Sequence, residues 1–332
     1  MQIALALPAL LTSLFVVTAE RLPFDLPALP WRVGAPYRRA AIAGAGSPSL
    51  LLTHHPSPWR PAGVTLTDAE RRLLRRCGEH VVISATVPPV ALPAGAQLAR
   101  AVARTLAHEC GGLLADPLTA ATLRAAALPG DLVGQPVGRP VGQPVGQPAG
   151  RPSGEPGAFR LGDGWLGWDV RVHDDATCPP WDPADTGACH ALSVTSRGLS
   201  RFALPEITLD GAACAHRLCA TGLLRTVAHR LVADQLAFLA TRPDTRLRLI
   251  DDHLRIEPPS PEAPLSVRLT PCETGPAEPG RTGSIRRLKI APATGGGRVS
   301  CLRVGPPSGF TGSVNDWLCA PRPACPTPAL AA

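Results

Sequence analysis

The sequence has few aromatic residues and almost no lysine, methionine or tyrosine. Of 332 residues only 4% are Phe, Trp or Tyr, and there is one Met, one Tyr (Tyr37) and one lysine (Lys289). Ala, Leu and Val must therefore fill any core, and arginine carries nearly all of the basic charge, a skew typical of a GC-rich genome. The net charge of +7 divides into about +4 before residue 133 and +3 after it. This even spread argues against a dedicated nucleic-acid domain.

Motifs of the common enzyme classes are also missing. The chain has no Gly-x-Ser-x-Gly, His-Glu-x-x-His or Walker sequence, which excludes the usual serine-hydrolase, zinc-protease and phosphate-loop arrangements. A long apolar run is absent too. Residues 3–19 are short for a bilayer and contain Pro8, so we expect no membrane span.

What the sequence does contain is a run of six tetrapeptides over Val133–Pro156: VGQP, VGRP, VGQP, VGQP, AGRP and SGEP. Each unit has a proline that removes a backbone donor and a glycine that adds backbone entropy, so neither helix nor strand can persist. We expect residues 133–157 to be a disordered insert. The alternative, a ligand for a proline-binding module, would use PxxP spacing, whereas this run has PxxxP.

The N-terminal residues 3–19 have two interpretations. They resemble the apolar region of a secretory signal, with Val17 and Ala19 suited to cleavage before Glu20, but no Lys or Arg precedes them. The alternative is a buried strand over Ser13–Thr18 that opens the first sheet. The missing basic residues favour the strand, and with it a cytoplasmic protein over one exported and cleaved near Ala19.

Between residues 20 and 132 the pattern predicts strands and helices in alternation. A capping box at Thr67–Glu70 predicts a helix over Asp68–Arg76 with a solvated arginine face. A second helix is expected over Ala94–Cys110. Its apolar stripe comprises Leu98, Ala101, Val102, Thr105 and Leu106, and its solvent side Gln97, Arg100, Arg104 and His108. Strands are expected at 49–53, 80–86 and 113–115.

Beyond the repeat, residues 158–257 predict three strands, one long helix and a hairpin. The strands are expected at 165–172, 191–195 and 206–210, and the helix at 215–240. The hairpin spans Leu247–Ile256 and turns near Asp251-Asp252. Residues 258–332 are rich in Pro and Gly, with short strands expected at 266–270, 285–290 and 299–304 and turns from Ser308 onward.

These patterns predict an α+β fold: a mixed sheet with two principal helices, interrupted by the Gly/Pro-rich insert and followed by a short-strand C-terminal extension. The expected divisions of the chain are 1–19, 20–132, 133–157, 158–257 and 258–332.

Residues 80–119 and 192–209 resemble two segments of a bacterial domain family without an assigned activity. The first carries A-R-x-V-A-R-x-L-A…G-G-x-x-x-D over Ala99–Asp116, and the second G-L-x-x-F-x-L-P-E over Gly198–Glu206, with Thr195 before it. The resemblance implies a bacterial origin and a single domain that includes both flanks of the repeat. It implies no catalytic residue.

Ten cysteines divide into two groups. Cys77 and Cys110 each end an expected helix in front of a glycine, where a buried thiol is ordinary. The other eight form sequence-adjacent pairs, 178/189, 214/219, 272/301 and 319/325. Such pairs suit disulfides in an exported protein, but spacing does not decide connectivity, and in the cytoplasm the thiols would stay reduced.

Few residues are candidates for a site. Cys214, His216 and Cys219, with His229 further along the same expected helix, come nearest to metal ligands. Zinc needs four converging ligands, and a second close cysteine pair is missing. We therefore expect no metal and no cofactor.

Two pairs of charged or titratable residues complete the candidates. His173 and Asp175 follow an expected strand end, where acid–base residues often lie, but no nucleophile accompanies them. Arg197 and Glu206 bracket the GLSRFALP segment and either form an ion pair that holds it or bind a ligand.

The leading hypothesis is a non-enzymatic binding or accessory protein. The alternative is a hydrolase or a thiol- or metal-dependent enzyme that uses His173, Asp175 or the Cys214–His216–Cys219 cluster. Convergence of two of these groups within hydrogen-bond reach would favour the enzyme. Ligand, partner and oligomeric state are not encoded in any motif.

Overall fold

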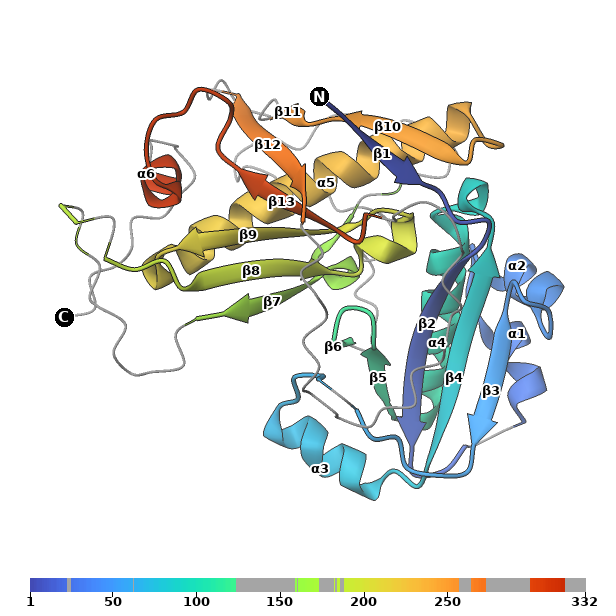
Figure 1. Ribbon diagram of the computed structural model, residues 1–332. Coiled ribbons are helices and arrows are strands. Elements are labelled where there is room, and N and C mark those ends of the chain that lie inside the picture. Colours follow the sequence, from blue (N-terminus) through green and yellow to red (C-terminus); the bar gives the residue numbers. More distant parts are fainter. Residues whose placement is uncertain are drawn as a thin grey trace, which may run out of the picture. The chain divides into compact units, whose positions relative to one another are not determined.

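The computed structural model describes residues 1–22, 25–61, 63–123, 161–172, 188–256, 264–272 and 299–319, with a few single positions between 159 and 185. The fold is α+β with mixed sheets (Figure 1). Contacts divide the chain into two compact units: unit 1 is Met1–Ala9 with Trp168–Ala332, and unit 2 is Leu10–Gly167. This division does not follow the expected boundaries at 133–157 and 257. The tetrapeptide run, His173, Asp175, Cys178, Cys325 and the strand expected at 285–290 lie outside the described residues.

Unit 2 contains a five-stranded antiparallel sheet in the order β3-β4-β2-β5-β6. Its strands are β3 (Leu51–His55), β4 (Glu79–Val87), β2 (Leu11–Ala19), β5 (Leu113–Asp116) and β6 (Ala121–Leu123). The strand expected at Ser13–Thr18 is confirmed as the middle of β2, which pairs with β4 along all nine residues. Phe15 and Val17 are fully buried, so β2 is the central core strand of this unit.

Helix α4 (Ala94–Cys110) packs against β2, β4 and β5, and its expected bounds are confirmed. It ends at Gly111, whose φ of +58° suits glycine. A Cβ on the next residue, Gly112, would lie 2.2 Å from the Thr18 carbonyl oxygen, so only glycine lets the chain pass this close to β2. The strands expected before and after this helix are present as β4 and β5, and β2 lies between them in the sheet.

The solvent side predicted for α4 is partly wrong. His108 is exposed, but Arg100 is buried, with its guanidinium carbon 4.3 Å from the centre of the Trp165 ring. Helices α1 (Leu29–Arg32) and α2 (Arg38–Gly44) also pack on α4. An arginine can be buried when its plane stacks on an aromatic ring, a pairing that helical periodicity cannot reveal.

Helix α3 (Asp68–Arg76) confirms the predicted capping box. The Glu70 amide donates to Thr67 Oγ1 over 3.3 Å, and the Thr67 amide donates to the Glu70 carboxylate over 2.7 Å. The arginines of this helix are exposed, as expected for a solvated face. Glu70 also accepts a hydrogen bond from Thr122, which ties α3 to β6.

Unit 1 has a six-stranded sheet in the order β11-β12-β13-β9-β8-β7 and a separate pair, β1 with β10. The strands are β1 (Gln2–Ala6), β7 (Gly167–Arg171), β8 (Leu192–Arg197), β9 (Glu206–Ala212), β10 (Leu247–Asp251), β11 (His253–Ile256), β12 (Leu265–Pro271) and β13 (Cys301–Gly305). β13 and β9 run parallel. The long helix α5 (Arg217–Thr241) packs on β8 and β9.

The hairpin predicted over Leu247–Ile256 is wrong. β10 pairs with β1, and β11 pairs with β12. Asp252 separates the two strands: its carboxylate lies 2.6 Å from the Met1 ammonium, and this hydrogen bond lowers the pKa of Asp252 to about 2. The N-terminal strand thus takes the place that a hairpin partner would have occupied.

The turns expected after Ser308 contain a short helix, α6 (Val314–Cys319). Its first turn is capped by Ser313, whose hydroxyl accepts from the Asp316 amide over 3.1 Å while the Asp316 carboxylate accepts from the Ser313 amide. In the described parts of the chain, none of the helices combines the length and apolar character needed to cross a bilayer.

Candidate functional site

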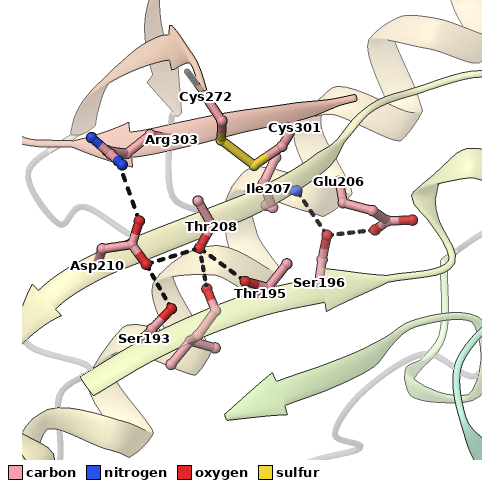
Figure 2. Close-up of a disulfide and its surroundings, with 11 residues drawn as sticks. Ser193, Thr195, Ser196, Glu206, Ile207, Thr208, Asp210, Cys272, Cys301 and Arg303 are labelled. Atoms are coloured by element: carbon pink, nitrogen blue, oxygen red, sulfur yellow. Dashed lines mark hydrogen bonds and ion pairs between the residues drawn. A yellow bond between two sulfur atoms is a disulfide. The ribbon is translucent and has the colours of Figure 1, made fainter. Parts of the chain in front are cut away.

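One face of the six-stranded sheet carries a row of hydrogen-bonded polar side chains across β8, β9 and β13 (Figure 2). We call this row the polar ladder, and its members are Ser193, Thr195, Thr208, Asp210 and Arg303. Ser193 Oγ donates to Asp210 over 2.6 Å, and the Thr195 and Thr208 hydroxyls lie 2.9 Å apart. Arg303 Nε lies 3.2 Å from the Asp210 carboxylate. The ladder therefore fixes its own side chains across three strands.

Strand alternation separates this polar face from an apolar one. Val194, Leu209, Leu302 and Val304 alternate with the ladder residues and are buried. Helix α5 packs on the same strands. By contrast, the Asp210 side chain is 37% exposed and the Arg303 side chain 57% exposed. The sheet therefore has one face in the core and one polar face that reaches solvent.

Glu206, at the start of β9, holds the loop that precedes it. One carboxylate oxygen accepts from the amides of Gly198 (2.9 Å) and Ser200 (3.2 Å). The other accepts from the Leu199 amide (3.3 Å) and from Ser196 Oγ (2.7 Å). The three amides belong to the start of a 3₁₀ turn over Leu199–Phe202, where the turn's own carbonyls cannot reach them, and a carboxylate is their natural cap.

The predicted ion pair between Arg197 and Glu206 is wrong. Arg197 Nη2 lies 3.0 Å from Asp169 on β7. Gly198, with φ of +106°, turns the chain between Arg197 and the turn, while Leu199, Phe202 and Leu204 are buried. The G-L-x-x-F-x-L-P-E pattern therefore encodes a loop conformation and its cap.

Replacing Glu206 by Gln is expected to lower the free energy of unfolding by about 2–4 kcal/mol, because the amide removes the charge and turns an NH₂ toward donors. The matched control is Arg197→Gln, which breaks a partly exposed ion pair and should cost about 0–1 kcal/mol. Urea unfolding followed by circular dichroism measures both. Equal small losses would show that the carboxylate does not hold the loop.

The structure decides part of the cysteine pairing. Cys272 and Cys301 form a disulfide between the end of β12 and β13, which confirms the 272/301 pair. Cys214 and Cys219 are not bonded to each other, because Cys219 is disulfide-bonded and Cys214 is not. Cys319 carries no disulfide either, so it is not bonded to its sequence neighbour Cys325. Cys77 and Cys110 are free thiols as expected.

Two thiol contacts lie beside α6. The sulfurs of Cys189 and Cys214 are 3.6 Å apart, and the Cys319 sulfur lies 3.3 Å from His216 Nε2. Asn315 of α6, fully buried, bridges the segments that carry the first pair. Its amide nitrogen donates to the Cys189 carbonyl over 3.2 Å, and its amide oxygen accepts from the Ala213 amide over 2.7 Å.

The candidate metal ligands are not brought together. His216 is buried against Cys319, Cys219 is in a disulfide, and His229 is on the exposed side of α5. Within the described ranges, no group of three or more His, Cys, Asp or Glu side chains is arranged to hold a metal ion. Cys214 is next to Cys189, a partner that sequence spacing did not suggest.

The Cys319–His216 contact brings one of the candidate residues, His216, within hydrogen-bond distance of a thiol. Burial lowers the pKa of His216. Burial, followed by the Asp316 carboxylate, raises the pKa of Cys319. Cys319 also lies at the carboxyl end of α6, where the helix dipole disfavours a thiolate. At neutral pH the pair is therefore thiol and imidazole, without an activated nucleophile.

Asn315 was not among the residues expected from the sequence, and Cys319 was expected only beside Cys325, because turns were expected where α6 lies. The signal that identifies this helix is Ser313 followed three residues later by Asp316, which form the observed capping interaction. Its neighbouring glycines and prolines obscured that pattern.

Comparison of the chain with protein-family models, curated proteins and solved structures finds no match. The resemblance of residues 80–119 and 192–209 to a bacterial family stays a prediction.

Proposed function

We propose that this chain is a non-enzymatic binding or accessory protein that presents the polar face of its six-stranded sheet to a partner. The observation that supports this proposal is the polar ladder: a hydrogen-bonded row on the solvent-reaching side of a sheet whose other side packs on α5. A surface that is fixed before binding loses less side-chain entropy when a partner arrives.

The chemistry of this face fits a partner that supplies carboxylates, such as an acidic protein segment. Arg303 and Arg268 lie on neighbouring strands with side chains 57% and 45% exposed. Each is near one acidic group, Asp210 for Arg303 and Asp252 for Arg268. Since a guanidinium has five N–H donors, a single pairing leaves others for a partner.

The experiment compares two double variants in the native host by chemical cross-linking and mass spectrometry. Arg268→Ala with Arg303→Ala removes the exposed cations of the proposed face. Arg217→Ala with Arg225→Ala removes two exposed arginines of α5 and is the matched control. We expect cross-links from the sheet to an acidic partner in the wild type and the control, and their loss in the face variant. Unchanged cross-links in the face variant would contradict the proposal.

The rival enzyme hypothesis has less support. Its residues His173 and Asp175 lie outside the described part of the chain, and the Cys214 sulfur lies beside the Cys189 thiol, which is not a base. The Cys319–His216 contact is between neutral groups. A thiol enzyme needs a lowered cysteine pKa, usually from a helix amino terminus or a charged imidazolium.

Cys319 is therefore expected to react slowly with iodoacetamide at pH 7, with a rate that rises only above the pH at which an exposed cysteine ionises. The side chain is exposed, so the physical reason is not access but a raised pKa: partial desolvation of the sulfur and the nearby Asp316 carboxylate both disfavour the thiolate. Peptide mass spectrometry that resolves each cysteine measures the rate from pH 5 to pH 10. Rapid labelling of Cys319 at pH 6, abolished by His216→Ala, would instead support the enzyme.

We propose that residues 1–19 stay in the mature protein and that it is cytoplasmic. The position of β2 at the centre of the unit 2 sheet supports retention of these residues. The Cys272–Cys301 disulfide is more typical of exported proteins, and it favours the alternative. Intact mass of the protein from its native host, with thiol counting, distinguishes the two.

A further inference from the structure

We infer that Cys189 and Cys214 are a reversible dithiol–disulfide pair that links the two strands at one end of the antiparallel β8–β9 pair. Their sulfurs are 3.6 Å apart, against about 2.05 Å in a disulfide, so bond formation needs only a small shift of the side chains. The inference is independent of the proposed binding function, because it concerns the opposite end of β8 from Arg197 and uses none of the ladder residues.

The position of the two residues in the fold explains their proximity. Leu192 at the start of β8 is the register partner of Ala212 at the end of β9. Cys189 lies three residues before Leu192, and Cys214 lies two residues after Ala212. They therefore flank the same end of an antiparallel pair, where a covalent link would hold the two strands together.

Asn315 holds the backbones on both sides of the pair. It accepts from the amide next to Cys214 and donates to the carbonyl of Cys189 itself. Because this side chain is fully buried, its two hydrogen bonds hold the backbone at Cys189 close to the backbone beside Cys214. Such a restriction raises the effective concentration of one thiol at the other and favours intramolecular oxidation.

The exposures of the two residues set the order of events. Cys214 is partly exposed and Cys189 is buried. With a small-molecule disulfide such as oxidised glutathione as the oxidant, the Cys214 thiolate attacks one glutathione sulfur, breaks the S–S bond and releases one glutathione thiolate. The Cys189 thiolate then attacks the Cys214 sulfur and releases the second. Two protein protons and two electrons pass to the oxidant, which leaves as two reduced glutathione molecules.

The test uses the full-length wild-type protein in glutathione buffers from fully reduced to fully oxidised. After an acid quench, the remaining thiols are alkylated in denaturant and the protein is digested with trypsin. Cys189 falls in the peptide 172–197, which also contains Cys178, and Cys214 falls in 202–217. We expect a disulfide cross-link between these two peptides, and fragmentation should assign it to Cys189. The cross-link should appear as oxidised glutathione rises and disappear on reduction.

Thermal unfolding supplies a second measurement. Since the bond closes a loop of about 25 residues, its formation should give the wild type a rise of about 5–10 °C in Tm, in addition to any rise from the Cys272–Cys301 and Cys219 disulfides. Cys214→Ser should remove both the cross-link and this rise, whereas Cys319→Ser, the matched control beside the same helix, should keep both. Two results would overturn the inference: alkylation of Cys189 and Cys214 across the whole buffer range, or linkage of Cys189 to Cys178 instead. Both are measured on the wild type, so neither depends on the folding of a variant.

Discussion

A protein that begins at Glu20 is expected not to fold. The deletion removes β1 and β2, and with β2 the central strand of the unit 2 sheet. The lost side chains include Phe15, Val16 and Val17, each at most 2% exposed, and the buried Ile3 and Leu5 of β1. Burial of each contributes about 1.5–3 kcal/mol, so together they match the whole stability of a typical protein, about 5–15 kcal/mol.

Circular dichroism and thermal unfolding of the truncated protein measure this result. No cooperative transition should remain. The graded variant Phe15→Ala should lower the free energy of unfolding by about 3–5 kcal/mol, whereas Leu10→Ala, at a position 59% exposed, should change it by less than about 0.5 kcal/mol. A truncated protein with the wild-type Tm would show that residues 1–19 are not part of the core, and would restore the signal-peptide interpretation.

Leu106→Ala is expected to lower the free energy of unfolding by about 2–5 kcal/mol. Leu106 is fully buried where α4 packs on its sheet, and truncation there leaves a cavity that the surrounding β2 and β4 side chains cannot fill. Denaturant unfolding measures the loss.

The matched control is His108→Ala, two residues along the same helix and exposed, which should stay within about 0.5 kcal/mol. Arg104 is not a suitable control, although periodicity placed it on the solvent side. It is half-buried beside Tyr37, whose phenol is also half-buried. Equal losses for Leu106→Ala and His108→Ala would mean that α4 does not pack through the face described.

Several helices and strands of this protein could be predicted from local sequence signals alone. The capping box at Thr67 and Glu70 identified α3 to the residue, and the apolar stripe with the Gly111-Gly112 stop identified α4 in the same way. The apolar run around Phe15 allowed two interpretations, a secretory signal or a strand, and the favoured one, the strand, is present as β2. These signals are local because caps, helical periodicity and strand propensity depend on residues a few positions apart.

The pairing of distant segments could not be predicted from these local signals. β1 pairs with β10 across more than 240 residues of chain, which no local pattern encodes. The same holds for Arg100 under Trp165, for Glu206 as a loop cap, and for Cys214 beside Cys189. Each of these contacts joins groups whose chemistry permits several partners, since an arginine, a carboxylate or a thiol pairs with whatever the fold brings within reach. Long-range packing makes that choice.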